Sequence, residues 1–185
     1  MKITTLAALL SATVLAACSV EAAHDHAAYA PASAIAVLHG TNGNEGVQGV
    51  VRFTQEDGYV HIEAEVSGLT PGKHGMHVHQ FGDSNCGDGK CTGGHFNPTG
   101  VDHGGPDAEV RHVGDLGNLV AGEDGTATYS RDDKHVALDM SSEACVIGRA
   151  IIVHGGEDDL TSQPTGAAGS RLAAGVIGIG KDTDE

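Results

Sequence analysis

The sequence predicts an all-β domain built from many short strands. Apolar and polar residues alternate with a period of two along much of the chain, and the spacing of amphipathic helices is almost absent. The 28 glycines predict numerous tight turns. Aromatic residues make up only 3% of the chain, so we expect a core of valine, isoleucine, leucine and alanine.

The first segment has the pattern of an export signal. Lys2 supplies a basic start, residues 3–14 are apolar but too short to span a bilayer, and Leu15-Ala16-Ala17 precede Cys18. This order resembles a bacterial lipobox, in which the cysteine is lipid-modified and becomes the first mature residue. We therefore predict a signal peptide over residues 1–17 and an exported lipoprotein, anchored through Cys18 to a membrane of the cell envelope with a periplasmic or outer-membrane location. An ordinary secretory signal with an incidental cysteine is the alternative.

The mature chain divides into a short tether and one domain. Residues 18–32 are rich in alanine and lack a hydrophobic period, which is typical of a flexible linker. His24-Asp25-His26 in this tether could bind a metal ion weakly, although a solvated linker is the better interpretation. Residues 33–185 show no repeat and no second composition class, so we predict a single domain.

Eight strand-like segments follow one another in this domain. They cover residues 33–39, 47–54, 59–66, 74–79, 118–121, 126–130, 144–154 and 174–179. Turn signals separate several of them, at residues 55–58, 69–72 and 123–125. Two long irregular segments, 80–116 and 155–173, remain, and loops of this length in a small domain are usually functional or disordered.

The charge balance excludes a nucleic-acid partner. The formal net charge is -15 at pH 7, and the chain has only ten lysines and arginines. A polyphosphate partner requires clustered basic residues.

A set of candidate metal ligands lies in or beside the two long segments. His77 and His79 are two positions apart in a strand, so both side chains point to the same face. His154 ends an apolar run that would deliver a third imidazole to the edge of a sheet. Three imidazoles suit copper or zinc, whereas the first pair alone would be weak evidence.

A second set needs one further ligand. His103, His112 and Asp115 offer two nitrogens and a carboxylate oxygen, one nitrogen short of a closed tetrahedral zinc shell. His95 lies between the two sets, and an imidazolate can bridge two metal ions through its two nitrogens. We assign the remaining histidines, which carry no such pattern, to ordinary surface or core roles: His24, His26, His39, His61, His74 and His135.

The strings around these residues resemble the copper-zinc superoxide dismutase family. They are HGMHVHQFGD (74–83), GGHFNP (93–98), HGGP (103–106), RHVGDLGN (111–118), VIGRAIIVH (146–154) and GSRLAAGVIGIG (169–180). The resemblance covers nearly the whole mature domain. It implies an eight-stranded Greek-key barrel or flattened sandwich, of immunoglobulin-like type, with two long functional loops. The first long segment, residues 80–116, would be the zinc loop, and the second, residues 155–173, the electrostatic loop.

The resemblance also implies a role for each residue of the site. One copper per subunit would be bound by His77, His79, His95 and His154, and one zinc per subunit by His95, His103, His112 and Asp115. Arg171 would bind the superoxide anion beside the copper, and Asp158 would accept hydrogen bonds from His77 and His103. Asp159 is adjacent in sequence, so the choice between the two aspartates stays open, and His74 resembles a structural core histidine.

The implied activity is the dismutation of superoxide to dioxygen and hydrogen peroxide in the cell envelope. Copper would cycle between two redox states, His95 would carry a proton as well as a metal, and zinc would hold His95 in place. The alternative is a non-catalytic copper- and zinc-binding lipoprotein of the same fold. The complete set of ligands together with Arg171 favours the enzyme, and the sequence leaves open whether it is a homodimer or a monomer.

Two features depart from the family pattern. The family links a zinc-loop cysteine to a cysteine at the position of Ala174, so that bond cannot form here; we predict a local Cys86-Cys91 disulfide instead, in an oxidising compartment. Two free or metal-bound thiols are the alternative, and we expect Cys145 to be a buried free thiol. The electrostatic loop is short and contains no lysine, so we expect Arg171 and the metals to supply most of the attraction for an anion.

Overall fold

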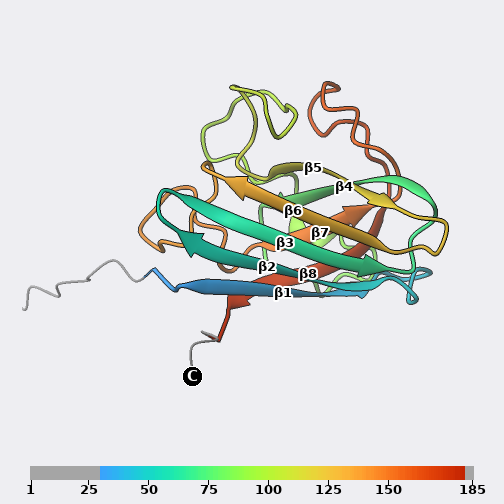
Figure 1. Ribbon diagram of the computed structural model, residues 1–185. Helices are drawn as coiled ribbons and strands as arrows, with labels where there is room; N and C mark the ends of the chain where they lie inside the picture. The colour runs from blue at the N-terminus through green and yellow to red at the C-terminus, as the bar shows by residue number, and fades with distance from the viewer. Residues whose placement is uncertain (1–29, 182–185) are drawn as a thin grey trace, which may run out of the picture.

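The computed structural model describes residues 30–181, which form a nearly closed antiparallel barrel (Figure 1). The elements are β1 (Ser33–Gly40), β2 (Gln48–Glu56), β3 (Tyr59–Ser67), β4 (Gly72–His79), η1 (Lys90–Thr92), β5 (Asp115–Ala121), β6 (Ala127–Asp133), β7 (Ala150–His154) and β8 (Arg171–Ile179). The strands lie in the order β5-β4-β7-β8-β1-β2-β3-β6. Because β3 pairs with β6 and β4 pairs with β7, the connections cross the ends of the barrel, and the predicted eight-stranded Greek-key fold is confirmed.

The signal peptide, Cys18 and the tether histidines lie outside the described residues. The predicted boundaries of the leader, tether and domain stay predictions. Within residues 30–181, no helix is long and apolar enough to cross a bilayer.

The core follows from the period of two in the strands. Successive side chains of a strand point to opposite faces, so the buried positions of β1 are Ala34, Ala36 and Leu38, while Ile35 and Val37 lie on the outer side. Aliphatic side chains of the other strands fill the interior in the same way. Two of the three phenylalanines join this core: Phe53 and Phe96.

A side chain helps to close the barrel between β5 and β6, which share no strand ladder among the described residues. The Tyr129 hydroxyl on β6 donates a hydrogen bond of 2.8 Å to the carbonyl oxygen of Leu116 on β5. Burial raises the pKa of Tyr129, so the phenol keeps the proton that it donates.

One predicted strand is half as long as expected. Residues 144–149 form turns, and β7 begins only at Ala150. Gly148 has a φ of 78°, and the Arg149 N–H donates to the carbonyl of Val146, which reverses the chain before the strand starts. Val146 is nevertheless fully buried. The apolar run therefore indicated burial and not strand geometry, an ambiguity that short apolar runs always carry.

The two long segments project from the same side of the barrel. In Figure 1 parts of both, coloured yellow-green and orange, rise above β4 and β5. Gln163 joins them: its side-chain amide donates to the His103 carbonyl at 2.9 Å and accepts from the His103 N–H at 2.8 Å. The two loops therefore bury the outer face of β4. In β1, β2 and β3, by contrast, the outer face meets water.

Candidate metal centre

The candidate ligands form two buried groups that share one residue. The first contains His77, His79, His95 and His154, and the second contains His95, His103, His112 and Asp115. Within each group the ligand atoms lie within 4.8 Å of one another. The first group offers only imidazoles and the second offers imidazoles with one carboxylate.

The strands bring the first group together. Met76 and Val78 of β4 point into the barrel core, so His77 and His79 point outward, beneath the loops. β7 pairs with β4 and ends at His154, which places the third imidazole beside them. An isolated bridge between His79 and His95 adds the zinc-loop residue.

Four buried ligand nitrogens make no well-aligned hydrogen bond among the described residues, although two of them lie 3.0 and 3.1 Å from Asp115 Oδ1. The four are His77 Nδ1, His95 Nε2, His103 Nδ1 and His112 Nδ1. A buried polar atom without a partner is costly, and such atoms in a native fold call for an explanation. Here each belongs to one of the two groups, so the lone pairs converge where a cation would satisfy them.

Three ligand rings are held by backbone carbonyl oxygens through one of their two nitrogens. His79 Nδ1 lies 3.0 Å from the Gly93 carbonyl, His154 Nδ1 3.3 Å from that of Gly169, and His112 Nε2 3.1 Å from that of Val101. A carbonyl oxygen only accepts, so these nitrogens must carry the hydrogen, and each ring keeps its lone pair on the other nitrogen. This fixing of tautomer and orientation is typical of metal-binding histidines.

Asp158 does the same for one ring of each group. One of its oxygens lies 2.8 Å from His77 Nε2 and the other lies 2.9 Å from His103 Nε2. Asp158 is fully buried, and Gly166 packs so closely that a Cβ there would lie 1.8 Å from Asp158 Oδ1. Asp158, and not its neighbour Asp159, therefore lies between the two rings.

His95 differs from the other histidines because both of its nitrogens face the site. Its Nδ1 lies 2.8 Å from Asp115 Oδ1, and its Nε2 is one of the atoms without a partner. Asp115 Oδ1 also lies 3.0 Å from His103 Nδ1 and 3.1 Å from His112 Nδ1. One carboxylate oxygen thus lies among three imidazole nitrogens, which is the donor set of a tetrahedral zinc site.

The environment keeps the rings of the first group uncharged. Burial lowers the pKa of His95 to about 4 and that of His154 to about 3. It also lowers the pKa of His77 and His79. At neutral pH these imidazoles therefore offer a lone pair to a metal ion and not a proton.

The second group instead attracts positive charge. Burial disfavours the charged form of His103, but the carboxylates of Asp115 and Asp158 outweigh it and raise the pKa of His103 to about 9. Burial likewise raises the pKa of Asp115, yet its three imidazole contacts hold that pKa well below the usual range. A site that favours a positive charge at this point fits a divalent cation.

Arg171 lies beside the first group. It is paired with His154 across the β7–β8 ladder, so its side chain starts next to a candidate ligand. The guanidinium donates to the Gly89 carbonyl at 2.7 Å, to the Thr92 hydroxyl at 3.0 Å and to the Gly93 carbonyl at 2.6 Å. None of these partners is a carboxylate, and no carboxylate of residues 30–181 forms an ion pair with the guanidinium, so its positive charge can act on an anion.

The acidic residues of the second loop are engaged elsewhere. Glu157 forms an ion pair with Lys73 at 2.6 Å. Asp159 accepts hydrogen bonds from Ser162 and Thr161 of its own turn, which lower its pKa to about 2. Asp158 is bound to the two histidines. Each of the three carboxylates therefore has a partner, and this reduces the repulsion of an approaching anion.

Cys86 and Cys91 form the predicted local disulfide, with their Cα atoms 5.6 Å apart. Ala174 lies beside Cys86 and Gly87 in a small hollow, so β8 approaches this loop without a covalent bond to it. Cys145 is the free cysteine of the described residues, and it is half-buried, whereas we expected full burial.

Removing this disulfide should destabilise the protein only modestly. For Cys86→Ser with Cys91→Ser we expect the free energy of unfolding to fall by about 2 kcal/mol, because so short a ring restricts the unfolded chain little. Urea unfolding of the metal-free protein measures this, with Cys145→Ser as the control. A loss above about 4 kcal/mol would mean that the bond also holds the folded loop in place.

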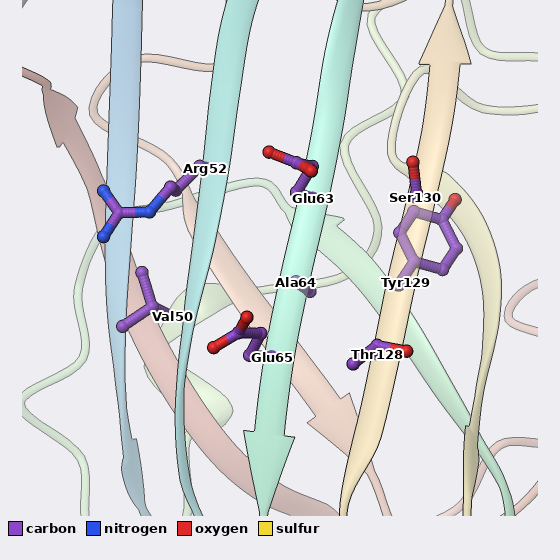
Figure 2. A pocket seen from close by; sticks show the side chains of 8 residues that line it. All are labelled: Val50, Arg52, Glu63, Ala64, Glu65, Thr128, Tyr129 and Ser130. Atoms are coloured by element: carbon purple, nitrogen blue, oxygen red, sulfur yellow. The ribbon is translucent and has the colours of Figure 1, made fainter. Parts of the chain in front are cut away.

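A groove on another face of the barrel illustrates why concavity does not locate the site. It has a volume of about 490 Å³ and lies on the outer face of β2, β3 and β6. Figure 2 shows Arg52 on β2 beside Glu63 and Glu65 on β3, with hydroxyl groups along β6. None of the candidate ligands lines it, so the chemistry of the donor atoms, and not the size of a hollow, identifies the metal centre.

Three supporting residues had no predicted role in the sequence. Arg111 and Asp133 form a fully buried ion pair beneath the zinc loop, and Thr92 places a buried hydroxyl between Arg171 and His79. Arg111 lies in a string that carries the resemblance, which was the only signal available for it. Thr92 had none, because a threonine in a loop is ordinary.

Comparison with known proteins agrees with this geometry. Residues 47–177 match the family model for copper/zinc superoxide dismutase. The chain is 48% identical over 159 residues to an extracellular superoxide dismutase [Cu-Zn] of Brugia pahangi, covering 80% of this chain and 76% of that protein. A crystal structure of the clock protein EA4 is similar with a TM-score of 0.75 and 42% identity, covering 83% of this chain and 98% of that one. The chain therefore belongs to the copper/zinc superoxide dismutase family, and it is an oxidoreductase of that class.

Proposed function

We propose that this protein dismutates superoxide with one copper ion bound by His77, His79, His95 and His154 and one zinc ion bound by His95, His103, His112 and Asp115. The observation that carries the proposal is the pair of buried donor groups that share His95. All-nitrogen donors suit copper, and nitrogens with one carboxylate suit zinc.

The reaction converts two superoxide anions and two protons into dioxygen and hydrogen peroxide. When bound, copper supplies a one-electron redox couple and zinc supplies a fixed positive charge without redox chemistry. The chain's own residues must then bind an anion and handle protons. Arg171 binds and orients the anion, since its guanidinium forms no ion pair with a carboxylate in the described part of the chain.

His95 is the residue that would exchange a proton with the substrate. Its Nε2 has no hydrogen-bond partner among the described residues, so this atom would either bind copper or carry a proton, and its low pKa means that it gives the proton up readily. Asp115 holds the Nδ1 side of the ring. Asp158 keeps one ring of each group in a fixed tautomer. Asp115 therefore holds the ring of His95 in place while the protonation of its Nε2 changes.

A superoxide-consumption assay, paired with metal analysis, tests the proposal. Protein reconstituted with copper and zinc should consume superoxide catalytically, and the metal-free protein should not. Protein that binds both ions without accelerating the reaction would instead support a non-catalytic copper- and zinc-binding function.

Replacing Arg171 with glutamine should slow superoxide consumption while both metals stay bound. A hydrogen bond from a charged donor contributes about 1.5–3 kcal/mol, so the rate constant should fall about tenfold or more. Stopped-flow kinetics with metal analysis measures both quantities. Arg52→Gln, on β2 outside the metal centre, removes the same charge and should leave the rate nearly unchanged; an equal loss in both variants would remove Arg171 from the mechanism.

We further propose that the protein is an exported lipoprotein of the cell envelope, attached through Cys18. The order of basic, apolar and small residues before Cys18 supports this, and the extracellular relative supports export. Cys18→Ser should release the protein from the membrane fraction, and recovery of the unchanged amount in that fraction would contradict the anchor.

A homodimer is our proposal for the quaternary state. Val37 on β1 and Val176 on the neighbouring strand β8 are exposed and line one hollow. Clustered exposed apolar side chains are typical of protein contacts. Sedimentation of the mature protein distinguishes a dimer from a monomer.

A further inference from the structure

Thr92 places a fully buried hydroxyl at the junction of the zinc loop and the candidate copper group. It is the last residue of η1 and has an exposed fraction of 0%. Burying a hydroxyl is unfavourable unless its hydrogen-bonding capacity is used. The contacts of this oxygen therefore indicate what it does.

The hydroxyl joins three groups. It donates its hydrogen to the Gly89 carbonyl at 2.9 Å. A hydroxyl has one hydrogen, so toward Arg171 Nη1, at 3.0 Å, the oxygen must accept. The same oxygen lies 3.3 Å from His79 Nδ1.

The neighbouring Gly93 carbonyl repeats this arrangement. It accepts from Arg171 Nη2 at 2.6 Å and from His79 Nδ1 at 3.0 Å. The Thr92 hydroxyl and the Gly93 carbonyl thus form two adjacent acceptors between the guanidinium and a candidate copper ligand. These two atoms, together with the Gly89 carbonyl, hold the guanidinium of Arg171 in a fixed orientation relative to the His79 ring.

Nothing covalent fixes this part of the loop to the strand that carries Arg171. The Cys86–Cys91 disulfide closes the loop on itself, and β8 presents Ala174 toward it. Gly89 lies directly against the Arg171 side chain: a Cβ there would be 3.4 Å from Arg171 Cδ. Attachment of the loop to Arg171 therefore depends on Gly89, Thr92 and Gly93.

We propose that Thr92 is a positioning residue that orients the Arg171 guanidinium for anion binding and couples it to His79. This inference rests on the proposed function, in which Arg171 binds superoxide. Without the hydroxyl, Arg171 Nη1 keeps only the Gly89 carbonyl, and that carbonyl loses the shorter of its two hydrogen bonds from Thr92, keeping the one from the Thr92 N–H at 3.3 Å. The guanidinium should then sample more orientations and bind an anion less well.

The variants Thr92→Ser and Thr92→Ala test this, because they differ only in the hydroxyl and both lack the methyl group. In protein loaded with copper and zinc, azide serves as the anion probe, titrated by the visible absorbance of Cu(II). We expect Thr92→Ala to lower the azide affinity and the superoxide rate constant about fivefold to tenfold, with Thr92→Ser within about twofold of the parent protein. Metal content should be unchanged in both.

A second readout requires neither copper nor turnover. In the zinc-loaded protein, NMR should show the Arg171 side-chain N–H exchanging with water several times faster in Thr92→Ala than in Thr92→Ser. Equal exchange in the two variants, or equal azide affinity, would overturn the proposal. Should Thr92→Ala fail to fold, the isosteric Thr92→Val is compared with the parent protein in both measurements, since these two differ only in the hydroxyl. Failure of the parent protein to consume superoxide would count against the proposed function alone, because the exchange measurement still tests Thr92.

Discussion

Replacing Arg111 with leucine is expected to lower the free energy of unfolding by about 3–5 kcal/mol, the cost of leaving a buried charge without its partner. Arg111 donates two hydrogen bonds to the Asp133 carboxylate, at 2.7 and 2.6 Å, and both side chains are buried. It also donates to the carbonyls of His112 and Asp115, at 3.1 and 3.0 Å. Urea unfolding of the metal-free protein measures the effect without the added stability of bound metal.

Two further variants identify the cause of this loss. Arg111→Leu combined with Asp133→Leu should recover part of the stability, because no charge then stays buried alone. Arg131→Leu is the matched control. Arg131 is partly exposed, and its contact with the same carboxylate is long, at 3.5 Å. A loss below about 1 kcal/mol for Arg111→Leu would show that the pair resembles a surface ion pair in energy. Weaker zinc binding should accompany the large loss, because Arg111 holds the backbone of two candidate ligands.

Replacing Asp158 with asparagine is expected to weaken zinc binding about 10- to 100-fold, as loss of a group that orients metal ligands usually does. An asparagine side chain keeps one accepting oxygen, so it can hold the ring of His77 or of His103 but not both. The backbone of residue 158 should stay in place, because it exchanges hydrogen bonds of 2.8 and 2.9 Å with the Asn118 side chain. Competition titration against a chromophoric zinc chelator measures the affinity.

Asp159→Asn is the matched control for this experiment. It removes the same charge one residue away, but Asp159 is exposed and bonds only to its own turn. We expect its zinc affinity to stay within about threefold of the parent protein, because an exposed charge is well screened. If the two variants weaken zinc binding equally, loss of charge and not ring orientation explains the effect.

Strand positions could be predicted wherever burial is one-sided. The alternation in β1 to β3 gave their extents to within two residues, because one face of each strand packs on the core and the other meets solvent. The prediction was wrong for residues 144–149, where both strand and turn would bury an apolar run. It also placed the start of β5 at Asn118, although the strand begins at Asp115, a polar residue buried by the zinc loop. Burial by a loop distant in sequence has no local pattern.

The candidate ligands were easier to predict than the residues that support them. Histidines at i and i+2 of a strand, and an imidazole at the end of an apolar run, carry a chemical signal of their own. Thr92 and the Arg111–Asp133 pair carry none, since each acts through partners 22 or more positions away or through a buried hydrogen bond. Their roles depend on which segments the Greek-key connections bring together.

The sequence by itself determined the all-β class, the family resemblance, the two sets of donor atoms and the absence of a cysteine at position 174, because these depend on residue type and spacing. Only the tertiary structure decided which aspartate lies between His77 and His103, since Asp158 and Asp159 are adjacent and equivalent in composition. It also decided how Arg171 is held. Its three acceptors lie 78 to 82 positions earlier in the chain, and hydrogen bonds over that separation exist only once the barrel brings β8 against the zinc loop.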